Sequence, residues 1–139
     1  TLAGQLDQRL PRTRFAPALT GTLIDYEKGL MWVADGNSPE GGNGGKPLDW
    51  YEALRWADGV RFAGFDDWRL PTEDELRALG QVPGADRAAL LPGTAPGLHW
   101  TKVPAGDVAK ALAVDLATGT ASREDKGRPL AVRAVRRPD

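Results

Sequence analysis

Two stretches of the sequence decide the fold: Gly64-Phe-Asp-Asp-Trp-Arg-Leu-Pro-Thr72 and, earlier in the chain, Lys28-Gly-Leu-Met-Trp32. In the later stretch, Trp68 is a large apolar side chain that we expect to anchor a junction between sheet and helix. Arg69 offers five N–H donors in a fixed fork, so we expect it to tie this turn to carbonyls or to a carboxylate. Pro71 ends the extended segment and begins a helix.

The earlier stretch lies at the centre of a predicted β-hairpin. Two β-rich runs, at 20–26 and 30–34, are separated by three residues that include Gly29. A short loop containing glycine between two such runs is typical of a hairpin, and glycine suits a left-handed position in the turn. Trp32 has apolar neighbours, and we expect it in the core.

Two capping boxes predict two helices. In each box an N-terminal side chain and a glutamate three residues later satisfy each other's free backbone N–H groups, as Asp49 can with Glu52 and Thr72 with Glu75. Apolar residues at helical spacing follow each box. These predicted inward faces consist of Trp50, Ala53, Leu54 and Ala57 in the first helix and of Leu76 and Leu79 in the second.

The remaining chain reads as loops and short strands. Glycine-rich composition predicts a mobile loop over 35–45, and composition rich in proline, glycine and alanine predicts a loop over 80–97. Strands are predicted at 99–103, 111–116 and 130–136. A hairpin, two helices and a final series of strands indicate an α+β fold with antiparallel sheet.

The N-terminal residues differ from the rest. Leu2, Leu6 and Leu10 recur every four positions before Pro11, which is typical of a short amphipathic helix and equally of the tail of a linker. We therefore divide the chain into an N-terminal segment or linker, 1–13, and one domain, 14–139. The first residue is not Met, so we expect a processed form or an excised fragment.

Composition excludes several function classes. Among 139 residues, 18 Lys and Arg balance 19 Asp and Glu for a net charge of −1, so we expect no nucleic-acid partner. No apolar run approaches the length of a membrane span, so we expect no membrane insertion. The absence of cysteine removes thiol nucleophiles, disulfides and thiolate metal sites, and one histidine is too few for a histidine-based zinc site.

Few residues suggest catalysis. The carboxylate pairs Asp66-Asp67 and Asp74-Glu75 are adjacent acids of the kind that usually cap helices or face solvent. His99 begins a predicted strand, and we expect it to be an edge or core histidine. No sequence motif of a nucleophile, a phosphate loop or a metalloprotease occurs. We therefore expect no enzymatic activity and no cofactor, and a hydrolase using paired carboxylates is the weakest hypothesis.

One segment could hold a cation. Asp35-Gly-Asn-Ser-Pro-Glu40 is rich in oxygen ligands of the type that Ca²⁺ prefers. The spacing of a helix–loop–helix calcium site fails, because Pro39 stands where the fifth-position ligand belongs. A plain flexible loop is the favoured interpretation, and Ca²⁺ binding is the alternative; no other metal site is expected.

Further segments complete a series with the two quoted first: Arg14-Phe15, 21–25, 49–54, Glu75-Leu76, 99–101, 113–119 and 132–136. In their order and spacing, these motifs resemble the Lcl C-terminal domain family, named for a bacterial collagen-like adhesin. The resemblance spans about 14–136, nearly the whole chain. It implies a C-type-lectin-like fold, with a twisted antiparallel β-sheet core, two helices and long surface loops.

The resemblance also implies a setting. Such domains occur in bacterial exported and surface proteins, so the expected location is extracellular, on the cell surface or periplasmic. The adhesin is similar to a trimeric tip that favours sulfated polysaccharides, which implies a homotrimer by analogy. Family members often carry a cysteine at the positions of Ala57 and Ala134, and these can form a disulfide. Here both are absent, so we expect packing alone to close the fold.

We expect ligand contacts to come from surface loops that the core of sheets and helices holds in place, namely 35–47, 102–110 and 120–129. The predicted ligand-binding residues, an aromatic ring that could stack on a sugar and four cations that could meet sulfate, carboxylate or phosphate, are Trp100, Lys102, Arg123, Lys126 and Arg128. Arg133 lies in a shared motif and is expected to be structural. The leading hypothesis is a recognition module that binds a glycan or a protein, and the alternative is a structural or oligomerisation module.

Overall fold

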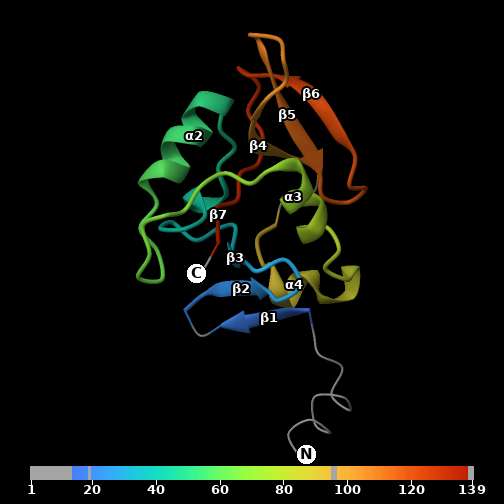
Figure 1. Cartoon of the computed structure of the whole chain (residues 1–139). Coiled ribbons are helices and arrows are strands. Elements are labelled where there is room, and N and C mark those ends of the chain that lie inside the picture. The colour runs from blue at the N-terminus through green and yellow to red at the C-terminus, as the bar shows by residue number, and fades with distance from the viewer. Residues whose placement is uncertain (1–13, 19, 95–96, 138–139) are drawn as a thin grey trace, which may run out of the picture.

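A computed structural model describes residues 14–18, 20–94 and 97–137, which form two antiparallel sheets with three short α-helices (Figure 1). The predicted segment 1–13 lies outside these described residues. The strands are β1 (Phe15–Ala18), β2 (Thr22–Asp25), β3 (Leu30–Val33), β4 (Leu98–Pro104), β5 (Lys110–Asp115), β6 (Ala121–Asp125) and β7 (Val135–Arg136). The helices are α2 (Trp50–Gly59), α3 (Glu73–Leu79) and α4 (Arg87–Leu90), with 3₁₀ turns at Asn43–Gly45 and Gly84–Asp86. The mixed α+β class is therefore as predicted.

The first sheet has the strand order β1-β2-β3-β7. Its β2–β3 pair runs from Thr22 opposite Val33 to Asp25 opposite Leu30, which confirms the predicted hairpin. Strand β1 was not predicted. It contains Pro17, which has no N–H to donate, and its place at the edge of the sheet is where a strand tolerates proline.

Both predicted capping boxes are present. The Asp49 carboxylate accepts from the N–H of Glu52 at 2.8 Å, and the Glu52 carboxylate accepts from the N–H of Asp49 at 3.1 Å. At α3, the Thr72 hydroxyl accepts from the N–H of Glu75 at 3.2 Å, and the reciprocal bond measures 2.9 Å. The two helices therefore begin where the sequence predicts.

Each of these helices covers a different part of the core. Helix α2 buries Trp50 in an apolar cluster with Trp100 of β4 and with β5. Helix α3 lies between the two sheets (Figure 1). From there Leu76 packs in a second apolar cluster, with Trp32 of β3 and Val114 of β5. The α3 helix therefore joins the sheets into one body.

Two loop predictions are wrong because the segments contain regular structure. Segment 80–97 includes α4, a helix of a single turn. Its start has no side-chain cap, so the sequence carries no local signal that predicts it. Segment 120–129 includes strand β6, which pairs with β5 from Lys110 opposite Asp125 to Val114 opposite Ala121. Strand β6 has no apolar alternation because it forms the outer edge of its sheet.

The predicted last strand, 130–136, is shorter than expected. Leu130 and Ala131 make single bridges to Leu48 and His99, and only Val135–Arg136 forms a strand beside β3. This segment crosses from one sheet to the other. Consequently it cannot pair with one neighbour along its whole length.

The glycine-rich segment 35–45, predicted as a mobile loop, packs its backbone against another part of the chain. The N–H of Gly36 donates to the carbonyl of Pro92 at 2.9 Å, and Gly36 itself is buried. A Cβ atom on Gly36 would lie only 2.5 Å from the carbonyl oxygen of Gly93. Glycine here permits close approach of two backbone segments.

The core depends on buried indoles. Two of their N–H groups donate to carbonyl oxygens far along the chain, Trp50 to Thr101 at 2.9 Å and Trp100 to Leu48 at 2.8 Å. Ala57 and Ala134, the positions that relatives can fill with cysteine, are both buried. Among the described residues, every helix is too short or too polar to span a bilayer.

The Glu75→Gln variant should lose about 2 kcal/mol of unfolding free energy. Burial alone would raise the pKa of Glu75, but hydrogen bonds from Arg69, at 2.7 and 2.8 Å, and from Thr72 hold it below its ordinary value. The amide cannot replace this bidentate pair. Urea unfolding measures the change, and Asp74→Asn is the matched control because the Asp74 side chain is 95% exposed. Equal losses of unfolding free energy in both variants would contradict a stabilising role for the Arg69–Glu75 pair.

Candidate functional site

Trp100, the predicted aromatic ligand contact, does not reach the surface. Its side chain is fully buried in the cluster against α2, and its indole N–H donates to the Leu48 carbonyl. The predicted stacking of Trp100 on a ligand is therefore wrong. Trp100 lies on the face of β4 that packs against α2. Predicting β4 as a strand could not show which of its faces is buried, because that depends on how the strand pairs and packs.

The predicted cations are divided between the two faces of the β4-β5-β6 sheet. Arg123 is exposed and pairs in register with Leu112, so both side chains share one face. The neighbouring Glu124 points to the opposite face, and there it forms an ion pair with Arg128. Lys102 is exposed on β4, where its backbone N–H donates to the Pro71 carbonyl. The structure does not bring these cations together.

Lys126 lies against the start of helix α2. Its Nζ is 4.6 Å from the ring centre of Trp50 and 5.3 Å from that of Tyr51, distances at which a cation is attracted to an aromatic face. Tyr51 is 51% exposed. The structure therefore pairs one predicted cation with an accessible aromatic ring that the sequence analysis did not select.

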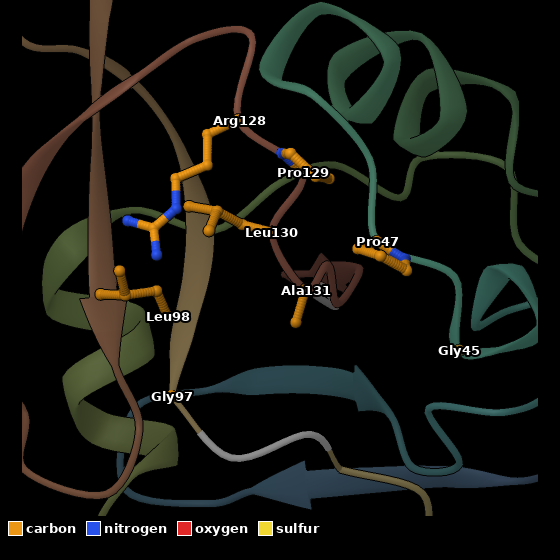
Figure 2. Close-up of a pocket in the computed structure, with 8 residues that line it drawn as sticks. All are labelled: Gly45, Pro47, Gly97, Leu98, Arg128, Pro129, Leu130 and Ala131. Carbon is orange, nitrogen blue, oxygen red and sulfur yellow. The ribbon is translucent and has the colours of Figure 1, made fainter.

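A groove of about 440 Å³ begins at Arg128, two residues after Lys126 in the chain. It is lined by Gly45 and Pro47, by Leu98 at the start of β4, and by the segment 128–131. Figure 2 shows the Arg128 guanidinium pointing from that segment toward Leu98, with Pro47 on the far side of Ala131. The volume of the groove is within the usual range of small-ligand sites. Arg128 is the charged residue among those that line the groove.

A smaller, more enclosed cavity of about 20 Å³ adjoins the groove and shares Gly45 and Ala131 with it. Arg133 and His99, both buried, line this cavity. Burial lowers the pKa of Arg133 to about 10, while the Asp35 carboxylate acts in the opposite direction. Arginine with this pKa is still cationic at neutral pH.

Arg133 holds three segments together. One terminal nitrogen donates to the carbonyls of Val33 and Ala34, each at 2.7 Å, and the other donates to the Thr94 hydroxyl at 2.7 Å. Arg133 therefore contacts other parts of the chain in a way that holds the domain together. Its Nε–H has no hydrogen-bond partner among the described residues.

The other residues expected to be structural are likewise buried or paired. Trp32 is fully buried in the core, and Trp68 donates its indole N–H to the Phe62 carbonyl at 3.1 Å. Arg69 forms its bidentate pair with Glu75, directly beside the buried Pro71.

Two of the acids that could suggest catalysis, Asp67 and Glu75, have structural partners. Asp67 receives hydrogen bonds from Arg136 at 2.5 and 3.1 Å, which hold the pKa of this carboxyl below its ordinary value. Asp35 accepts from the N–H of Asn37 at 2.8 Å, so it orders its own loop. Within 14–18, 20–94 and 97–137, no group of three or more His, Cys, Asp or Glu side chains could hold a metal ion.

Sequence reasoning missed Tyr51, Pro47 and Leu98. A signal for Tyr51 was available, because the inward face of α2 begins at Trp50 and the next residue of a helix must point away from it. Pro47 and Leu98 carry no local signal. Their role depends on the segment 128–131, which lies far from both along the chain.

The free energy of unfolding should fall by about 1.5 kcal/mol between pH 6.5 and about pH 5 because of His99. Burial, and next the charge of Arg133, lower the pKa of His99 from 6.5 to about 4. In this range the unfolded chain therefore binds a proton that the folded chain does not, and stability present above pH 6.5 is lost as the pH falls. Urea unfolding across this range measures the slope.

The His99→Gln variant supplies the control, since its side chain does not titrate. It should show a much flatter pH dependence than the native chain above the range in which carboxylates titrate. A slope that is the same in both proteins would assign the effect to other groups.

Comparison with known proteins adds one positive result. No curated protein matches the chain. The family model described as the Lcl C-terminal domain matches residues 21–136, which include the groove, both sheets from β2 onward and helices α2 to α4. The chain therefore belongs to the Lcl C-terminal domain family.

Proposed function

We propose that this domain is a non-catalytic recognition module of a bacterial exported or surface protein, and that its groove binds an acidic glycan. The observation that carries the proposal is the open groove of about 440 Å³ with Arg128 at its rim. Guanidinium groups bind carboxylate and sulfate through paired, charge-assisted hydrogen bonds. Glycans that bear such groups therefore fit the chemistry of this rim.

The surface next to the groove supports a glycan of several sugars. The N–H of Trp50 donates to the carbonyl of Lys126, and Leu48 pairs with Leu130 in both directions, so the start of α2 and the segment 126–130 run side by side. Tyr51 and Lys126 thus continue the surface that begins at Arg128. An exposed aromatic ring can stack on a sugar, and the lysine adds a second positive charge.

Family membership supports a surface-associated, adhesin-like setting. We extend the proposal to an extracellular, cell-surface or periplasmic location, to a C-type-lectin-like arrangement of the two sheets and helices, and to assembly as a trimer. The proposed binding needs no cofactor, because the positive charges are supplied by side chains. Neither Ca²⁺ nor a catalytic acid takes part in it.

The alternative is a structural module that docks to itself or to another protein. The exposed large apolar side chains among the described residues are Tyr26, Tyr51, Phe65 and Val108. They belong to two hairpin turns, a helix and the 62–65 turn, and so are spread over four different segments. Glycan binding is therefore the proposal that the groove supports better.

Binding to sulfated or uronate-containing glycans should weaken about tenfold in Arg128→Ala, since one charge-assisted contact is lost. Binding should also weaken with added salt. A glycan array at two salt concentrations measures both effects. Arg123→Ala is the matched control, because this exposed cation lies on the sheet face opposite to Glu124 and its loss should leave binding unchanged.

Glu124→Gln should strengthen the same binding, because Glu124 forms an ion pair with Arg128 and competes with an anionic ligand. Titration of one array-positive glycan into the native and variant proteins measures the affinities. A protein that binds no glycan and assembles as its concentration rises would instead support the structural alternative.

A further inference from the structure

We propose that the groove at Arg128 selects an acidic sugar that also carries an O-acetyl group, and that the acetyl methyl packs on the apolar lining of the groove. This inference rests on the glycan binding proposed above and specifies the chemistry of the sugar. Among the described residues that line the groove, Arg128 has the one side chain that can form hydrogen bonds. The apolar side chains of the lining are those of Pro47, Leu98, Pro129, Leu130 and Ala131.

This apolar lining is open to a ligand. Pro47 and Pro129 are exposed, Leu98 and Ala131 are partly exposed, and the Arg128 side chain is 54% exposed. In Figure 2 the guanidinium points toward Leu98 at one side of the groove, and Pro47 lies on the other side of Ala131. A sugar whose anionic group is bound to Arg128 would therefore extend over apolar surface.

The backbone of the lining has few free hydrogen-bonding groups. Leu130 exchanges two backbone hydrogen bonds with Leu48, each of 3.0 Å, so both its N–H and its carbonyl have partners. The Ala131 carbonyl accepts from the N–H of Trp100 at 3.1 Å. The two prolines of the lining have no N–H to offer. A sugar hydroxyl turned toward this surface would leave water without gaining a partner from these groups.

These two properties decide which sugar substituents the groove favours. A hydroxyl group pressed against apolar surface gives up hydrogen bonds to water without replacement, which is unfavourable. Acetylation removes that hydroxyl donor and adds a methyl group, which gains from contact with the apolar lining. A carboxylate or sulfate elsewhere on the same sugar keeps its charge, so its pairing with Arg128 is retained. The lining thus distinguishes sugars by acetylation, and Arg128 distinguishes them by charge.

A matched pair of probes tests the proposal: oligosaccharides from an O-acetylated polysaccharide that contains uronate, and the same oligosaccharides after mild alkaline hydrolysis of their acetyl esters. In calorimetric titration, binding should weaken about fivefold when the acetyl groups are removed, because the contact of one methyl group is lost. Pro129→Ser and Leu98→Ala should each bring this ratio toward one, since both reduce the apolar surface of the groove. Pro83→Ser is the matched control, an exposed proline outside the groove, and it should keep the full ratio.

Nuclear Overhauser contacts between the acetyl methyl and the Leu98 methyl groups give the direct readout. Equal binding of the two forms by the native protein, or tighter binding of the deacetylated form, would overturn this inference and leave the proposed function standing. Binding of neither form would overturn it as well, and the glycan array described above then shows whether the proposed function fails with it.

Discussion

The buried guanidinium of Arg133 is the contact on which the rest of the structure depends. It joins the end of β3, at Val33 and Ala34, to the segment around Thr94, and it does so from the last stretch of the chain, about 100 positions away from β3. The N–H of Val33 returns a bond to the carbonyl of Ala134 beside it. Burying a charge is costly, so the surrounding acceptors must be held in fixed positions. In a chain without disulfides, this contact performs the joining that a covalent bridge can provide.

The proposed recognition surface depends on the contacts around Arg133. Because Gly36 packs against Pro92 and Gly93 at the side of Arg133, the segment that continues to Pro47 is held as one wall of the groove. The opposite wall comes from the segment that leads into Arg133 itself. The groove is thus a product of packed backbone, and a glycine-rich segment that looks like an open loop by composition forms one of its walls.

Local signals predicted much of the fold and little of the site. The capping boxes at Asp49 and Thr72 and the hairpin at Gly29 are decided by neighbouring residues, and the sequence predicted them correctly. Trp100 shows the limit. Its aromatic side chain suits a core and a ligand site equally, and only the pairing of β4 with β5 and the packing of α2 assign it to the core. The division of the cations between two faces is likewise a property of strand register, which no single segment contains.

That register has a consequence for how such a domain can change its preference. Successive side chains of β6 alternate between the faces, so Arg123 looks away from the groove while Glu124 looks toward Arg128. Insertion or deletion of one residue in the turn that joins β5 to β6 would slide the strand by one position and exchange the two. Arg123 would then stand beside Arg128 in place of Glu124, and the recognition surface would become more strongly positive with every charged residue retained.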